Sequence, residues 1–188
     1  MKKIFLLLTI CTFLSSCTKD KGIDGCTDSY AVNYNPNANY EDGSCLYECA
    51  DPYAVNFNIL SPYYGCEYEA DVIFYLNEFA SDYFSSMGIS LLDVWVENQY
   101  VGTLNTNLYI NGGIPNCTDD YGTAAVNFIL AWNDQNLSSN FWETTFNWSV
   151  RDPSGFIHYN GTDLALSGNC LPMMLSLKKI QEYKQATK

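Results

Sequence analysis

Basic residues are scarce in this 188-residue sequence, and almost all of them lie near its two ends. Between Gly22 and Leu177 the only lysine or arginine is Arg151, while the same stretch holds nineteen acidic residues. A protein that binds nucleic acid needs a basic face to neutralise phosphates. The formal net charge of −12 therefore excludes nucleic acid as a partner.

The usual signatures of catalysis are also missing. The sequence has a single histidine, His158, and contains no G-x-S-x-G nucleophile motif, no H-E-x-x-H zinc motif and no glycine-rich phosphate loop. An enzyme requires a nucleophile with its base, a pair of carboxylates or a metal. We therefore expect that the protein is not an enzyme and that His158 is a packed or surface side chain.

No apolar run is long enough to cross a membrane, but a short one follows the N-terminus. Met1-Lys2-Lys3 is positively charged and Ile4–Ile10 is apolar, a pattern typical of a secretory signal peptide. The residues Leu14-Ser15-Ser16-Cys17 resemble a bacterial lipobox. The resemblance implies that residues 1–16 are removed and that Cys17 is lipidated. The lipid would anchor the protein to a membrane, which is therefore its first expected partner. The alternative is a freely secreted protein with a chance cysteine at this position.

The residues after Cys17 bear on the destination of such a lipoprotein. Residue 18 is Thr18 and not the aspartate that resembles an inner-membrane retention signal. The resemblance therefore implies the outer membrane of a Gram-negative bacterium. Lys19-Asp20 looks like the short signals that send some lipoproteins to the cell surface, but Lys21 departs from that pattern.

Eight cysteines are present, and two of them are accounted for by the leader and the anchor. Cys11 is removed with the signal peptide and Cys17 carries the lipid. The other six are Cys26, Cys45, Cys49, Cys66, Cys117 and Cys170. An even number of cysteines in an exported protein predicts disulfides, although six cysteines allow fifteen pairings. A zinc site is the alternative, but one histidine and the absence of C-x-x-C argue against it.

An internal repeat narrows the choice of pairing. The segment Cys26–Asn35 aligns with Cys49–Asn58, and seven of the ten positions are identical. Each unit then closes with a glycine at or near the next cysteine. We therefore expect one disulfide within each unit, Cys26–Cys45 and Cys49–Cys66, which leaves Cys117 to pair with Cys170.

The first unit has the pattern C-T-D-x-x-A from Cys26 to Ala31 and D-G-S-C from Asp42 to Cys45. It resembles a cysteine-loop module, C-T-D-x-x-A-x-N-Y-…-D-G-S-C, of secreted and lipid-anchored proteins of Gram-negative bacteria. There the module often precedes a small β-domain. The resemblance implies no activity, and the second unit departs from it because Ile59–Pro62 replaces the asparagine-rich run.

Oxygen-bearing side chains gather in the first unit and suggest two interpretations. They are Asp28, Asn33, Asn35, Asn37, Asn39 and Asp42. Alternating carboxylates and amides around a tight loop are typical of calcium sites, so these six are candidate Ca²⁺ ligands. The alternative is a loop of Asx-turns, in which Asn and Asp bind their own backbone. We expect no cofactor other than such an ion.

From residue 67 onward the hydrophobic pattern has the period of β-strands. In Ile89–Glu97, apolar residues alternate with acids, and Asn98-Gln99 then predicts a turn into Tyr100–Leu104. Seven or eight short strands with turn signals between them predict an antiparallel, immunoglobulin-like β-sandwich. The expected organisation is a signal peptide (1–16), a lipidated tether (17–25), two disulfide-closed units (26–66), the β-sandwich (67–170) and a tail or short helix (171–188).

Four tryptophans are the remaining candidates for ligand contact. They are Trp95, Trp132, Trp142 and Trp148. Trp95 alternates with acids on the predicted outer face and is therefore the candidate for glycan contact, whereas strand aromatics usually fill cores. We expect a non-catalytic, lipid-anchored cell-envelope protein that serves surface binding, adhesion or envelope organisation, with a glycan or a surface protein as partner. The alternative is a carbohydrate-binding surface lipoprotein that uses exposed aromatics.

Overall fold

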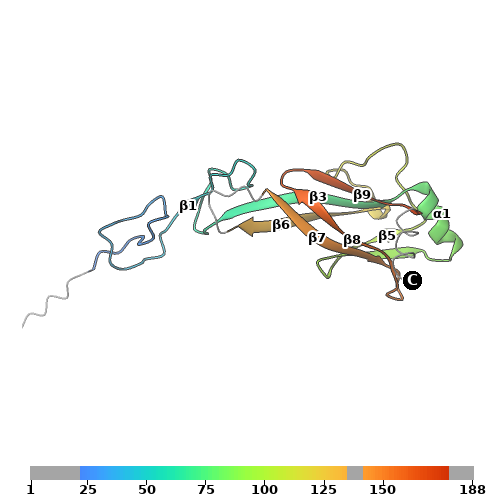
Figure 1. Cartoon of the computed structure of the whole chain (residues 1–188), viewed down its shortest axis with the longest axis horizontal. Helices are drawn as coiled ribbons and strands as arrows, with labels where there is room; N and C mark the ends of the chain where they lie inside the picture. The colour runs from blue at the N-terminus through green and yellow to red at the C-terminus, as the bar shows by residue number, and fades with distance from the viewer. Residues whose placement is uncertain (1–21, 135–141, 178–188) are drawn as a thin grey trace, which may run out of the picture.

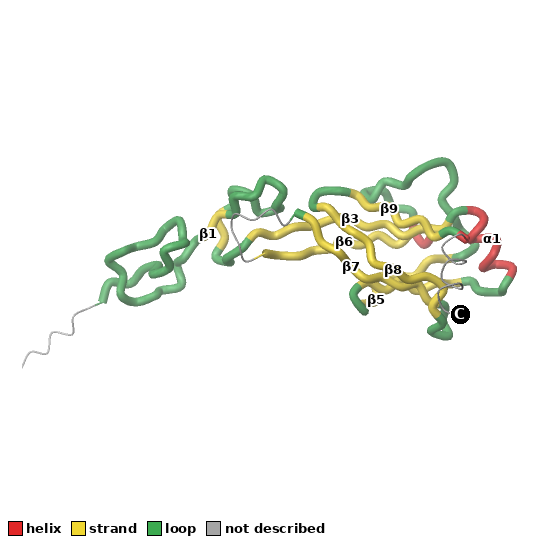
Figure 2. Tube along the Cα trace, in the orientation of Figure 1, coloured by secondary structure: helices red, strands yellow, loops and turns green. Residues whose placement is uncertain are grey.

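The computed structural model describes residues 22–134 and 142–177, which form an elongated and mainly β chain (Figures 1 and 2). The two disulfide-closed units follow one another at one end, and the β-domain makes up the other end (Figure 1). The predicted signal peptide 1–16, the lipidation site Cys17, the first residues of the tether and the segment 178–188 lie outside the described residues.

All three expected disulfides are present. They join Cys26 to Cys45, Cys49 to Cys66 and Cys117 to Cys170. The first two each close one repeat unit. The third spans 53 positions of sequence and ties a long loop to the last strand of the β-domain. The predicted pairing is therefore confirmed.

An aspartate and a tyrosine make the same bond in both units. The hydroxyl of Tyr47 donates to Asp28 Oδ2 in the first unit, and the hydroxyl of Tyr68 donates to Asp51 Oδ2 in the second, each over 2.8 Å. Each tyrosine lies two residues after the cysteine that closes its unit. The repeat therefore extends beyond the second cysteine of each unit, through Cys-x-Tyr-Glu at 45–48 and 66–69.

A repeated asparagine fastens each unit in the same way. Asn33 accepts a bond from the backbone N–H after Cys45 and donates to the carbonyl before it. Asn56 makes the same two bonds on either side of Cys66. A polar side chain that bonds backbone groups in this way satisfies donors and acceptors that no sheet or helix would satisfy. The identical residues of the repeat are thus the framework of a small, disulfide-closed loop.

Within the described residues, the β-domain consists of strands with the helix α1 and the 3-10 turn η1. The elements of the chain are β1 (Tyr47–Glu48), β2 (Leu60–Ser61), β3 (Cys66–Leu76), α1 (Glu78–Ser86), β4 (Leu91–Val96), β5 (Gln99–Asn105), η1 (Gly122–Ala124), β6 (Ala125–Asp134), β7 (Glu143–Arg151), β8 (Ile157–Leu166) and β9 (Cys170–Leu175). β1 and β2 form a two-stranded ribbon within the repeat units. The larger sheets have the strand orders β6-β3-β9 and β5-β4-β7-β8.

The two larger sheets share one hydrophobic core. Val72 and Phe74 of β3 belong to the same buried cluster as Val94 of β4 and Phe146 of β7. Inward and outward side chains alternate along β4, because successive residues of a strand point to opposite faces. Two sheets that bury one face each against the other agree with the general expectation of a β-sandwich.

The second half of β3 is buried on both faces. Phe74 and Leu76 face the main core, while Ile73 and Tyr75 lie under the loop that Cys117 anchors. The chain then leaves the sheet at Asn77, whose side chain accepts a bond from Ala80 N and caps α1. This helix was not expected from the sequence.

The C-terminal part of the β-domain differs from the expectation in two respects. β9 covers residues 170–175, so a strand occupies the first residues of the segment 171–188, for which a tail or a short helix was expected. β9 also runs parallel to β3, with Cys170 opposite Asp71. The other strand pairs are antiparallel, as expected.

The hairpin between β4 and β5 lies one residue earlier than predicted. Its two turn residues are Glu97 and Asn98, with φ of 46° and 63°, and Val96 pairs with Gln99. Two central residues with positive φ match the twist of the flanking strands. In the part of the chain that the structure covers, no helix combines the length and the hydropathy needed to span a bilayer.

Candidate functional site

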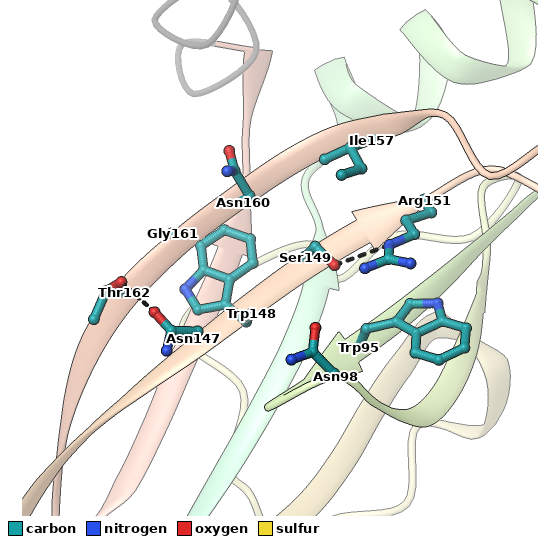
Figure 3. A pocket seen from close by; sticks show the side chains of 10 residues that line it. All are labelled: Trp95, Asn98, Asn147, Trp148, Ser149, Arg151, Ile157, Asn160, Gly161 and Thr162. Carbon is teal, nitrogen blue, oxygen red and sulfur yellow. Dashed lines mark hydrogen bonds between the residues drawn. The ribbon is translucent and has the colours of Figure 1, made fainter.

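A pocket lies on the outer face of the four-stranded sheet, across β4, β7 and β8 (Figure 3). Its volume is about 280 Å³. The lining combines the indoles of Trp95 and Trp148, a guanidinium, three asparagine side chains and two hydroxyl groups.

Strand register brings these side chains together from distant parts of the sequence. Trp95 on β4 is opposite Ser149 on β7, and Ser149 is opposite Asn160 on β8. The next pair on the same face is Asn147 with Thr162. Residues directly opposite one another in adjacent strands share a face of the sheet, so three strands supply one surface.

Trp95 is partly exposed on this face, as its alternation with acidic residues predicts. Its ring meets the exposed Tyr100 edge-on, with the centroids 5.8 Å apart. The guanidinium carbon of Arg151 lies 4.9 Å from the Trp95 ring centroid, within the range of a cation–π contact. The indole therefore supports the one cation of the pocket.

Arg151 is held in place but only partly used. Its Nε donates to Ser149 Oγ over 3.1 Å (Figure 3). Its terminal amino groups make no hydrogen bond or ion pair within the described residues. Arg151 is also the only lysine or arginine of those residues. The guanidinium is thus oriented at the pocket and retains free donors.

The two carboxylates nearest to Arg151 along the strands are engaged elsewhere. Asp93 is opposite Arg151 across β4 and β7, but its Oδ1 accepts a bond from the Thr103 hydroxyl. Asp152 follows Arg151 in the chain and is bound by Ser154 and His158. Neither carboxylate lies within ion-pair distance of the guanidinium.

The asparagines of the pocket fall into two groups. Asn147 is occupied, because its amide donates to Glu97 and its Oδ1 accepts from the Thr162 hydroxyl. Asn98 and Asn160 are exposed, and their side-chain amides make no hydrogen bond within the described part of the chain. Two amides are therefore available to a ligand, each able to donate and to accept.

The other tryptophans have structural positions. Trp148 is buried at 5% exposure, and its Nε1 donates to Asp163 over 2.7 Å, in a space left free by Gly161. Trp132 stacks on Tyr68, and Trp142 packs near Tyr53 of the second unit; their positions are given by ring centroids 5.7 and 5.5 Å apart. Of the two tryptophans that line the pocket, Trp95 is the more exposed and is therefore the candidate for ligand contact.

The candidate calcium ligands of the first unit act mainly as loop caps. Asp28, Asn35 and Asp42 each accept a bond from the backbone N–H two residues further on, which is the Asx-turn alternative. Asn33 and Asn39 also accept backbone bonds, from Leu46 N and Ile23 N. Asn37 contributes its backbone N–H to Asn35. The Asx-turns account for the asparagine-rich run without an ion, and calcium stays a hypothesis.

One further cluster in the described residues has the composition of a metal site. Cys26, Glu41 and Cys45 bring their ligand atoms within 4.8 Å of one another. The two sulfurs are joined in a disulfide and hold no thiolate for a metal. Glu41 instead accepts bonds from Thr27 N and Gly43 N, and these bonds, that from Thr27 foremost, lower its pKa.

His158 is a packed side chain, as expected. Its exposed fraction is 6%, and its ring meets the rings of Phe84 and Phe156 edge-on. Its Nε2 bonds Asp152 over 2.9 Å, and Asp152 also accepts from Ser154. The aspartate lies between the serine and the histidine, whereas nucleophilic catalysis needs the base next to the nucleophile.

A second pocket, of about 470 Å³, lies where the second unit meets β6. It is lined by Tyr63, Tyr64, Gly65, Glu67 and Asn133. Glu67 is its one charged side chain. This pocket therefore lacks the combination of cation, free amides and indole that distinguishes the pocket at Trp95.

Comparisons with family models, with curated proteins and with solved structures find no match to this chain. The site is therefore interpreted from its own geometry. The sequence identified Trp95 but not the free amides of Asn98 and Asn160, nor the role of Arg151 beside them. The isolation of Arg151 among acidic residues was the one signal that pointed to it.

Proposed function

We propose that this protein is a non-catalytic, lipid-anchored binding protein of the bacterial cell envelope, and that it binds carbohydrate in the pocket at Trp95. The observation that carries the proposal is a partly exposed indole beside two free amides, one on β8 and one in the turn between β4 and β5. Sugars present apolar C–H groups and many hydroxyls, which suit an aromatic ring flanked by groups that donate and accept.

The position of the pocket suits binding from a membrane. The lipobox-like segment ends at Cys17, next to the first disulfide unit, and the pocket lies in the domain at the other end of the elongated chain (Figure 1). An anchor at Cys17 would hold the pocket away from the lipid surface of the outer membrane. The acidity of the domain favours this arrangement, because a negative surface is repelled by anionic lipid.

The sandwich supports an immunoglobulin-like interpretation. Its seven strands divide into sheets of three and four, the division of constant-type immunoglobulin domains. β4 and β7 are neighbours although β5 and β6 come between them in the chain, and β6 belongs to the other sheet. Connections that pass between sheets in this way are Greek-key connections, which such domains share. An experimental structure with its strand connections traced tests this interpretation.

Binding is tested with a glycan array and two single variants. Trp95→Ala removes the ring of the pocket, whereas Phe79→Ala removes an exposed aromatic of α1 that lies outside it, with an exposed fraction of 70%. We expect a class of glycans to bind the unchanged protein and Phe79→Ala equally and Trp95→Ala at least tenfold more weakly, which corresponds to about 1.4 kcal/mol. Equal binding by all three proteins would contradict the proposed site.

The anchor has a separate test. Cells that express the protein are labelled with radioactive palmitate, and the membrane fraction is compared with that of the Cys17→Ala variant. We expect label in the unchanged protein and none in the variant. An unlabelled, freely secreted protein would refute the lipoprotein interpretation while leaving the pocket unaffected.

A further inference from the structure

We infer that the ligand of the pocket is an acidic glycan, whose sugar carboxylate binds Arg151. This inference rests on the proposed function, since it specifies the class of carbohydrate bound at the same site. It depends on one feature that carbohydrate binding does not require. The only lysine or arginine of the described residues lies in the pocket and bears no carboxylate partner there.

The surroundings of Arg151 make this feature unusual. Nineteen acidic residues share the described part of the chain with it, yet its guanidinium forms no ion pair with any of them. Asp93 and Asp152, the nearest along the strands, bind hydroxyl and histidine groups instead. Hydrogen bonds from Ser154 and His158 lower the pKa of Asp152 to about 2, so this carboxylate stays ionised and bound.

The guanidinium is also oriented before any ligand arrives. Its Nε is fixed by Ser149 Oγ, and the group lies between this hydroxyl and the Trp95 ring (Figure 3). These contacts leave the terminal amino groups open. A planar guanidinium binds a carboxylate through parallel N–H···O bonds, and less entropy is lost when the donor is held beforehand. Carboxylate recognition therefore uses the donors that the protein leaves free.

The neighbouring amides favour an acidic sugar over a simple anion. Asn98 lies beside Trp95 at the hairpin, and Asn160 lies beside Ser149 on the adjacent strand. An inorganic anion would need positive charge alone, whereas the ring and two free amides suit the hydroxyls and C–H groups of a sugar. A uronic acid, which carries its carboxylate on the sugar ring, presents all of these groups together.

The overall charge gives the site its selectivity. The acidic residues of the domain repel anions. Arg151, the one lysine or arginine of the described residues, lies in the partly enclosed pocket and can attract an anion there. An anionic membrane does not fit this pattern, because lipid headgroups are attracted by clusters of basic residues. A polymer of uronic acids can bring one carboxylate to the pocket while its other charges remain in water.

The experiment uses the purified full chain and a matched pair of ligands. Oligogalacturonate and its methyl ester have the same sugar rings and differ at the carboxyl group, which is charged in the acid and a neutral methyl ester in the other. Binding of each is measured by calorimetry at low and at physiological salt. The variants are Arg151→Gln, Arg151→Lys and, as a control of equal charge change outside the pocket, Asn169→Asp at an exposed position of the loop before β9. Thermal melting confirms that each variant is folded.

We expect the acid to bind about 10- to 100-fold more tightly than the ester, the range given by hydrogen bonds to a charged group. Arg151→Gln should remove this preference, so that acid and ester bind with the same affinity, and Arg151→Lys should retain only part of it. Asn169→Asp should behave as the unchanged protein. The preference should also weaken as salt rises.

Three outcomes would overturn the inference, and they separate it from the proposed function. If acid and ester bind equally, and Trp95→Ala weakens both, the pocket is a glycan site that does not distinguish charged from neutral sugars. Inorganic phosphate that competes as well as the uronate would indicate a simple anion site. Binding of neither ligand, together with no glycan on the array, would remove the proposed function as well.

Discussion

The two repeat units allow one hydrogen bond to be compared in two environments within a single chain. Tyr68 donates to Asp51 and Tyr47 donates to Asp28, over the same distance of 2.8 Å. The exposed fractions are 0% for Tyr68 and 3% for Asp51, whereas Tyr47 and Asp28 are only partly buried. Tyr68→Phe and Tyr47→Phe each remove one hydroxyl and leave the ring in place.

The expected magnitudes follow from what replaces the lost donor. Water can reach Asp28 after Tyr47→Phe, so the free energy of unfolding should change little. At Asp51 the carboxylate oxygen would be left buried without its donor, and bonds to charged groups contribute about 1.5–3 kcal/mol. We expect Tyr68→Phe to lower the free energy of unfolding by about 3 kcal/mol, which corresponds to a melting temperature lower by about 6–12 °C in a chain of this size.

The assay is urea unfolding with the disulfides intact, followed by tryptophan fluorescence. Trp132 is a suitable reporter because its ring stacks on Tyr68, with an interplanar angle of 15°. Thermal melting of the same proteins gives a second measure of stability. The argument is that burial determines how much this hydrogen bond contributes to stability. An equal decrease in the free energy of unfolding in the two variants, or a decrease below about 1 kcal/mol for Tyr68→Phe, would refute it.

Four further predictions concern other parts of the chain. Replacing both Cys117 and Cys170 by serine opens a loop of 53 positions, and urea unfolding should show a loss of about 4 kcal/mol; an unchanged midpoint would contradict this. Tyr159→Phe should be neutral or stabilising by up to about 1 kcal/mol in the same assay, because the buried Tyr159 hydroxyl has no hydrogen-bond partner within the described residues. The lowered pKa of Asp152 implies stability that is present above its ordinary value of 3.8 and lost as the pH falls towards 2. The difference in stability between the unchanged protein and Asp152→Asn should therefore shrink over that interval, and a constant difference would exclude this linkage. Because the Asx-turns need no ion, a chelator and millimolar calcium should give the same melting temperature, and protection by calcium would revive the metal hypothesis.

Local patterns in the sequence predicted the features that depend on neighbouring residues. The repeat gave the disulfide pairing because each unit is closed on itself, and strand alternation placed Trp95 on the outer face. β9 was missed because its apolar residues fit either a short helix or a buried strand, and only pairing with β3 decides between them. α1 was missed because it is only nine residues long, too short to show a clear helical periodicity in the sequence.

The pocket itself depends on register and was not predictable in detail. Arg151, Asn98 and Asn160 come from three separate segments, and their proximity follows from the pairing of β4 with β7 and of β7 with β8. A shift of one residue in either pairing would turn these side chains to the other face. The sequence showed that Arg151 is the only lysine or arginine between Gly22 and Leu177, but it did not show which side chains lie beside Arg151 on the sheet.

The contacts that join the first unit to the second, and the second unit to the β-domain, have a consequence for the distance between the anchor and the pocket. The strand that leaves the first unit, β1, pairs with β2 of the second unit, and the ring of Tyr64 packs against Tyr47 at this joint. The strand that leaves the second unit begins β3, where Trp132 covers Tyr68 in the corresponding way. Each unit therefore ends in a strand that the following part of the chain completes. A copy of the unit inserted between the first unit and the second could make the same strand and ring contacts with its neighbours at both ends. The distance between the anchor and the pocket could therefore change by whole units without any change in the pocket.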